Sequence, residues 1–102
     1  MTDTKLKFGE MLFEWDEEKN KINIKKHGVD FNDAAMIFSD ENRIETFDEL
    51  HSDEEERWQV IGKVKDVLFV VYTERIESIR LISARKADAY ERRMYYAGAE
   101  SY

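Results

Sequence analysis

The sequence predicts a small α+β domain in which two helices precede an antiparallel sheet and a third helix follows it. Apolar residues recur at helical spacing between Phe31 and Phe38 and again between Ala87 and Ala97. The segment between them changes period, because Arg57 to Lys63 alternates polar and apolar residues and Val67 to Tyr72 is an unbroken apolar run. Helices separated in sequence from a group of strands are typical of the α+β class.

The first helix has the clearest boundaries. It follows a short expected strand, Met11 to Trp15. Asp16 suits the N-cap, acidic residues fill the first turn, and Gly28 suits the position just past the end. We therefore expect a helix from Glu17 to His27. Its apolar content is low, so tertiary contacts must hold it in place.

The other elements follow in order along the chain. A second helix is expected to begin at Asp30, with its buried stripe ending at Phe38. The expected strands after it are Arg43 to Phe47, Arg57 to Lys63, Val67 to Tyr72 and Ile79 to Ala84. Short connections make the last three strands an antiparallel meander. The last helix carries its apolar stripe from Ala87 to Ala97.

The chain has 102 residues, which favours one domain. We expect that domain to span residues 11–102. Met1 to Glu10 shows no apolar periodicity and is expected to be a loose extension. There is no cysteine, which favours a reducing compartment and hence a cytoplasmic location. No apolar run is long enough to cross a bilayer, so no membrane association is expected.

The net charge of −7, taken alone, argues against a nucleic acid as partner. The charges are unevenly distributed, however. An acidic middle runs from Asp40 to Glu56, while basic residues gather from Lys19 to Lys26 and again from Arg75 to Arg93. This asymmetry predicts two faces with different partners. The alternative is a solvated surface whose charges are patchy.

Several short segments, taken together, resemble the BrnT family of bacterial type II toxins. The resemblance covers about Met11 to Tyr96. The segments, in order, are Phe13-Glu14-Trp15-Asp16, Lys25-Lys26-His27-Gly28-Val29, Glu55-Glu56-Arg57-Trp58, Tyr72-Thr73-Glu74-Arg75 and Ile79-Arg80-Leu81-Ile82-Ser83-Ala84-Arg85.

This resemblance implies a compact fold like that of the RelE ribonuclease toxins and an RNA-cleaving, translation-inhibiting activity. It also implies inhibition by a BrnA-type antitoxin in a hetero-oligomer, which would bind operator DNA through the antitoxin. The extension before Met11 departs from the family pattern.

RNA carries its own nucleophile, the 2′-hydroxyl, so an enzyme needs only proton transfer and charge stabilisation. Arginine suits the second task because its planar fork matches phosphate oxygens. We expect Arg57 and Arg80 to stabilise the transition state, and Lys26 or His27 to supply charge or proton transfer. Arg80 and Arg85 have opposite parity, so an unbroken strand cannot present both on one face.

A second set of residues is expected to bind substrate without taking part in the chemistry. It consists of Thr73, Ser83, Arg85 and His51. His27 and His51 lack the spacing of a metal site, so neither a metal nor another cofactor is expected. For each candidate, ordinary packing or a solvated position is the alternative interpretation.

Two other functions compete with the ribonuclease. The first is an interaction module that binds an antitoxin and acts in operon repression without cutting RNA. The second is a carboxylate-based hydrolase that uses the acidic middle, although that segment carries no recognisable motif. Cleavage of RNA in the presence of EDTA distinguishes the ribonuclease from the interaction module.

Overall fold

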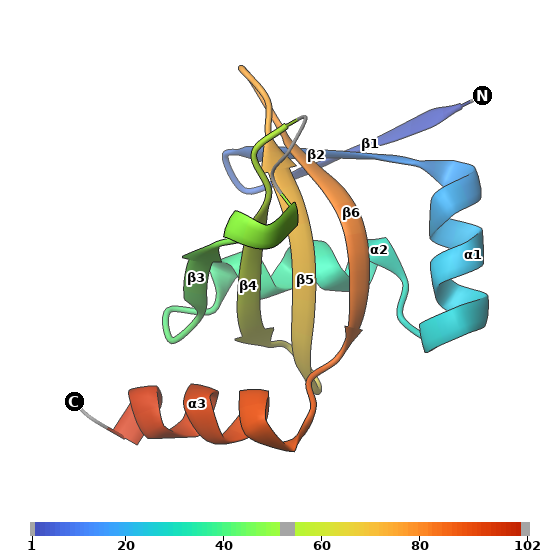
Figure 1. The fold of residues 1–102 in the computed structure, drawn as a ribbon. Coiled ribbons are helices and arrows are strands. Elements are labelled where there is room, and N and C mark those ends of the chain that lie inside the picture. The colour runs from blue at the N-terminus through green and yellow to red at the C-terminus, as the bar shows by residue number, and fades with distance from the viewer. Residues whose placement is uncertain (1, 52–54, 101–102) are drawn as a thin grey trace.

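A mixed six-stranded sheet forms the centre of the molecule (Figure 1). The computed structural model describes residues 2–51 and 55–100. The elements in chain order are β1 (Asp3–Phe8), β2 (Met11–Asp16), α1 (Glu17–His27), α2 (Phe31–Ala35), the 3₁₀ turn η1 (Met36–Ser39), β3 (Ile44–Phe47), the 3₁₀ turn η2 (Glu49–His51), β4 (Trp58–Lys63), β5 (Val67–Glu74), β6 (Ile79–Lys86) and α3 (Ala89–Glu100). Within these residues, no helix has the length and apolar character needed to span a membrane.

The α+β class is confirmed, but the sheet is not purely antiparallel. Its strand order is β1-β2-β6-β5-β4-β3. Neighbours from β6 through β3 are antiparallel, whereas β2 pairs in parallel with β6 through Phe13 opposite Ile79 and Glu14 opposite Arg80. Parallel neighbours need a long crossover connection, and the chain between β2 and β6 provides one. The expectation of an antiparallel sheet is therefore wrong at this one junction.

The segment before Met11 is a strand, and the expectation of a loose extension is wrong. β1 pairs antiparallel with β2 from Asp3 opposite Asp16 to Phe8 opposite Met11. Gly9, with φ of 63°, stands at the first central position of the two-residue turn, where a type II′ hairpin requires glycine. Leu6 and Phe8 alternate with lysines and pack against the hydrophobic core. The strand forms because β2 offers both a free edge and an apolar face to cover.

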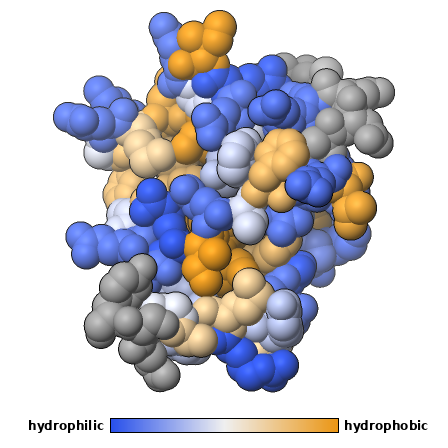
Figure 2. Space-filling view, turned by 60° about the vertical axis from the view of Figure 1, so that its left-hand side comes forward, coloured by the Kyte–Doolittle hydropathy of each residue, from blue (hydrophilic) through white to orange (hydrophobic). Residues whose placement is uncertain are grey.

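The main core lies between α2 and the back of the sheet as drawn in Figure 1. Its largest fully buried side chains are Trp15, Phe13, Phe31, Ile37, Val60 and Val70. A smaller cluster joins α3 to the sheet through Tyr95, Ala87, Ile61 and Val67. Figure 2, which brings the β3 side forward, shows apolar side chains in separate areas among hydrophilic ones. On the front face of the sheet, Thr73 and Val71 of β5 pair with Arg80 and Ser83 of β6, so polar and apolar side chains are mixed there.

Helix α1 is anchored by buried asparagines instead of an apolar stripe. Asp16 caps its N-terminus, and Gly28 ends it in the left-handed conformation with φ of 71°. Asn20 accepts a hydrogen bond from the Phe31 N–H at 2.9 Å. Asn23 donates to the Ala84 carbonyl at 2.8 Å and accepts from the Ala84 N–H at 3.1 Å. The Asn23 side chain thus pairs with β6 as a neighbouring strand would.

We expect Asn23→Ala to lower the free energy of unfolding by about 2–4 kcal/mol, because it leaves buried backbone groups of Ala84 without partners. Chemical denaturation monitored by circular dichroism measures this loss. Lys25→Ala, on the exposed side of the same helix, is the control and should change stability by less than about 0.5 kcal/mol. Equal effects of the two variants would contradict this account of how α1 is held.

Candidate functional site

Three of the residues expected from the sequence form one row across the front of the sheet. Thr73 of β5 pairs with Arg80 of β6, and the pairing of Trp58 with Tyr72 sets Arg57 beside Thr73. Strands lie about 4.8 Å apart, so the Arg57 and Arg80 backbones are separated by about 10 Å. Residues opposite each other on neighbouring strands project to the same face, so these three residues share one face of the sheet.

A β-bulge places Arg80 and Arg85 on the same face. Tyr72 pairs with Leu81 and Val71 pairs with Ser83, so Ile82 is an extra residue in β6. One extra residue reverses the parity of the strand beyond it. The parity argument from the sequence holds only for an unbroken strand, and this bulge interrupts β6 between the two arginines.

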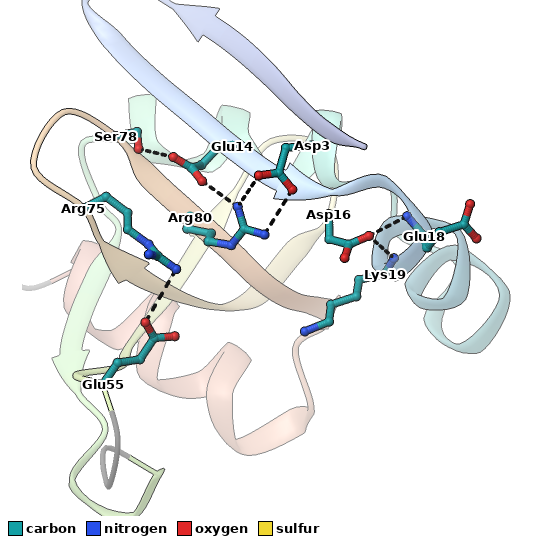
Figure 3. Close-up of polar contacts among 9 residues, drawn as sticks. All are labelled: Asp3, Glu14, Asp16, Glu18, Lys19, Glu55, Arg75, Ser78 and Arg80. Atoms are coloured by element: carbon teal, nitrogen blue, oxygen red, sulfur yellow. Dashed lines mark hydrogen bonds and ion pairs between the residues drawn. The ribbon is translucent and has the colours of Figure 1, made fainter. Parts of the chain in front are cut away.

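Arg80 is bound by two carboxylates from the N-terminal hairpin (Figure 3). Its Nη1 and Nη2 donate to the two oxygens of Asp3, each at 3.2 Å. Its Nη1 also donates to Glu14 Oε2 at 2.5 Å. Ser78 donates to the other Glu14 oxygen at 2.5 Å. These acceptors stand on β1 and β2, far from Arg80 in sequence.

The charges of this cluster reinforce each other. The hydrogen bond from Ser78, together with Arg80, lowers the pKa of Glu14 although burial opposes ionisation. The hydrogen bond from Arg80 likewise lowers the pKa of Asp3. Both carboxylates are therefore ionised at neutral pH. The sequence did not identify Asp3, Glu14 or Ser78 as site residues. The one available signal was the position of Glu14 in an expected strand, which indicates the face of the sheet on which its side chain lies.

The turn that joins the Arg57 end of the row contains a histidine oriented by a buried aspartate. His51 Nδ1 lies 3.1 Å from both oxygens of Asp48. The Asp48 N–H donates to the Arg57 carbonyl at 2.9 Å, which ties this turn to the start of β4. Burial opposes ionisation of Asp48, yet hydrogen bonds from His51 and Gln59 outweigh it and lower its pKa. The His51 side chain remains 65% exposed.

Thr73 and Arg85 have structural partners. The buried Thr73 hydroxyl donates to the Glu56 carbonyl at 2.7 Å, which supports the chain just before Arg57. Arg85 donates from its two terminal nitrogens to Glu91 of α3, at 2.8 and 2.9 Å. The Arg85 guanidinium also lies 4.2 Å from the centre of the Phe69 ring. These contacts dock α3 on the sheet, while the half-buried Ser83 lies on the same face.

Lys26 and His27 are not part of this row, because they lie in the last turn of α1. Lys26 is exposed. His27 is half-buried and lies four residues after Asn23, on the helix face that packs inward. The structure thus separates the two arginines from the two α1 candidates in the fold.

The acidic middle forms several small contacts in its described part. Glu55 pairs with Arg75 at 3.6 Å, and Tyr95 donates to Asp40 at 2.6 Å. Asp53 and Glu54 lie outside the described residues. Across residues 2–51 and 55–100, no three histidine or acidic side chains are grouped so that they could hold a metal ion.

The chain is a small α+β domain in which Arg57, Thr73 and Arg80 form one row on the face of the sheet opposite the main core. The model of the family described as the ribonuclease toxin BrnT of type II toxin–antitoxin systems matches residues 15–91. The crystal structure of the Brucella abortus ribonuclease toxin BrnT is similar with a TM-score of 0.54 and 28% identity, covering 72% of this chain and 92% of that chain. No curated protein matches the sequence. The chain belongs to the BrnT family of ribonuclease toxins.

The lowered pKa of Glu14 predicts a specific dependence of stability on pH. A carboxyl group with a lowered pKa stabilises the fold above its ordinary value of 4.5, and this stability is lost as the pH falls through the lowered value. We expect Glu14→Gln to cost about 1 kcal/mol at pH 7 and to reduce the further loss of stability between about pH 5 and pH 3.

Denaturation curves recorded across that pH range measure both effects. Glu18→Gln removes an equal charge from the exposed first turn of α1 and serves as the control. If all three proteins lose stability in parallel on acidification, Glu14 does not carry the proposed linkage.

Proposed function

We propose that this chain is a metal-independent endoribonuclease that cuts RNA through the RNA's own 2′-hydroxyl. The observation that carries the proposal is the row in which Arg57 and Arg80 flank Thr73 on the face of the sheet opposite the main core. Family membership supports RNA as the substrate. The two guanidinium groups would bind the non-bridging oxygens of the scissile phosphate, because their planar forks match that geometry.

The reaction needs two proton transfers and no external nucleophile. A base removes the 2′-hydroxyl proton, and the 2′-oxygen forms a bond to phosphorus. The bond from phosphorus to the 5′-oxygen breaks, and an acid protonates that oxygen. The products are a 2′,3′-cyclic phosphate and a 5′-hydroxyl end. Arg57 and Arg80 would stabilise the extra negative charge on the phosphorus-bound oxygens in the transition state.

We assign one of these proton transfers to His51. Asp48 engages Nδ1 while the His51 side chain remains 65% exposed, and a carboxylate at Nδ1 is how a catalytic histidine is oriented. The backbone contact between Asp48 and Arg57 supports this assignment, because it joins the histidine turn to the arginine row. Lys26 and His27 are the alternative source of charge or protons. Ser83 and Arg85 would stand beside the bound RNA on the same face.

The proposal includes a partner and a cellular effect. A BrnA-type antitoxin would neutralise the toxin in a hetero-oligomer and would connect it to operator DNA, and free toxin would inhibit translation in the cytoplasm. A fold relationship to RelE toxins belongs to the same proposal. The net charge of −7 supports a basic partner, since charge complementarity accelerates association.

Replacing either arginine of the row tests the proposal directly. We expect Arg57→Ala and Arg80→Ala each to lower the rate of RNA cleavage by about 10²–10³-fold, as for loss of one preorganised donor. Lysine at either position should restore part of the rate, because it keeps the charge and loses the fork. The double variant should lose less than the product of the single losses. Cleavage is followed on a labelled RNA in the presence of EDTA.

Arg93→Ala on α3 removes the same charge from an exposed position and is the matched control. Melting temperatures are needed alongside, because Arg80→Ala leaves Asp3 and Glu14 facing each other without their cation. Full activity in folded Arg57→Ala and Arg80→Ala would overturn the arginine assignment. Absence of RNA cleavage by every form of the protein would favour the interaction module.

The chain has two histidines, so each can be tested against the other. We expect His51→Ala to lower cleavage by about 10²-fold or more, which is the usual contribution of general acid–base catalysis. His27→Ala should leave the rate largely unchanged, because His27 belongs to the end of α1. The reverse result, at equal melting temperatures, would assign proton transfer to the α1 end.

A further inference from the structure

Arg80, the residue proposed to bind the RNA phosphate, already binds an anion from the same chain, the carboxylate of Asp3. Asp3 meets Arg80 with two parallel hydrogen bonds of 3.2 Å, one from each terminal nitrogen. Arginine binds a phosphate through the same pair of donors. Arg80 lowers the pKa of Asp3, so this carboxylate is ionised at the pH at which RNA would bind. The Asp3 carboxylate therefore occupies the position at which two phosphate oxygens would bind Arg80.

The strand that delivers Asp3 is firmly positioned. Pairing with β2 along the whole of β1, together with packing of Leu6 and Phe8 on the core, holds β1 against the sheet. At its start, the Glu17 N–H donates to the Thr2 carbonyl at 3.1 Å, and the Thr4 hydroxyl donates to the Glu17 carboxylate. These contacts fix the backbone on both sides of Asp3. The family model begins at residue 15, so β1 lies outside the region that it describes.

Asp3 and Glu14 differ in how readily they can leave Arg80. Glu14 is 18% exposed and is also held by Ser78, whereas the Asp3 side chain is 47% exposed. Replacing Asp3 by an RNA phosphate exchanges one anion for another and leaves no buried charge unpaired. The displaced Asp3 side chain turns toward the solvent, which costs little free energy because exposed ion pairs are weak. Glu14 would remain to orient the guanidinium.

We propose that β1 is an autoinhibitory strand whose Asp3 competes with the RNA phosphate for Arg80. This inference rests on the proposed function, in which Arg80 binds the scissile phosphate. Occupation of Arg80 weakens RNA binding without abolishing it, because the contact is half exposed and screened by salt.

The test compares Asp3→Asn with Glu10→Gln. Both remove one negative charge from the same hairpin, but Glu10 lies in the turn at the opposite end from Asp3. Binding is measured by fluorescence anisotropy with a labelled 2′-O-methyl RNA, which cannot be cut through its 2′-oxygen. We expect Asp3→Asn to bind this RNA about threefold to tenfold more tightly than wild type, with a smaller gain at high salt. Glu10→Gln should bind as wild type does.

The double variant Asp3→Asn/Arg80→Ala shows whether the gain passes through Arg80. Its affinity should equal that of Arg80→Ala alone. If the gain persists without Arg80, or if Glu10→Gln produces the same gain, general charge repulsion explains the result and the inference is overturned. If Asp3→Asn binds as wild type while Arg80→Ala binds more weakly, the inference fails and the proposed function survives. If Arg80→Ala does not weaken binding in either background, the proposed function fails as well.

Discussion

The architecture depends on how the edge of β6 is completed. β2 pairs with β6 at two positions only, and beyond them the edge is taken over by Asn23, whose amide bonds both backbone groups of Ala84. A buried backbone group without a partner is costly, so this replacement lets β2 turn away into α1. The short parallel contact that remains holds Glu14 against Arg80.

The two faces of the sheet carry different kinds of side chain. The back carries the aromatic and aliphatic core, and the front carries the polar row from Arg57 to Arg80. The bulge at Ile82 extends the front face by turning Arg85 toward Glu91, so that α3 closes the lower end of the sheet. One irregular residue, Ile82, thus determines both the docking of α3 and the placement of Arg80 and Arg85 on the same face.

Arg80 illustrates how an acidic protein holds a cation on the face of its sheet opposite the core. Two carboxylates neutralise it in the free chain, one held by Ser78 and one half exposed. The alternating pattern of β4 predicted that Arg57 would face away from the core. No pattern in the sequence predicted which acids would meet Arg80, because its partner Asp3 lies 77 residues away.

The sequence by itself determined the elements whose signals are local. Asp16 and Gly28 set the limits of α1, and the apolar pattern predicted β4, β5 and β6. The helix expected between Asp30 and Phe38 ends at Ala35 and continues as the 3₁₀ turn η1, and the order of segments indicated the family. The sequence alone did not predict β1: Leu6 and Phe8 alternate with lysines over only a few residues, and a single hairpin is marginal without a sheet to join. Only the tertiary structure decided the parallel pairing of β2 with β6, the bulge at Ile82 and the Asp3 contact. Each of these depends on which groups meet across long stretches of chain, and the local periodicity of one segment holds no information about its distant partner.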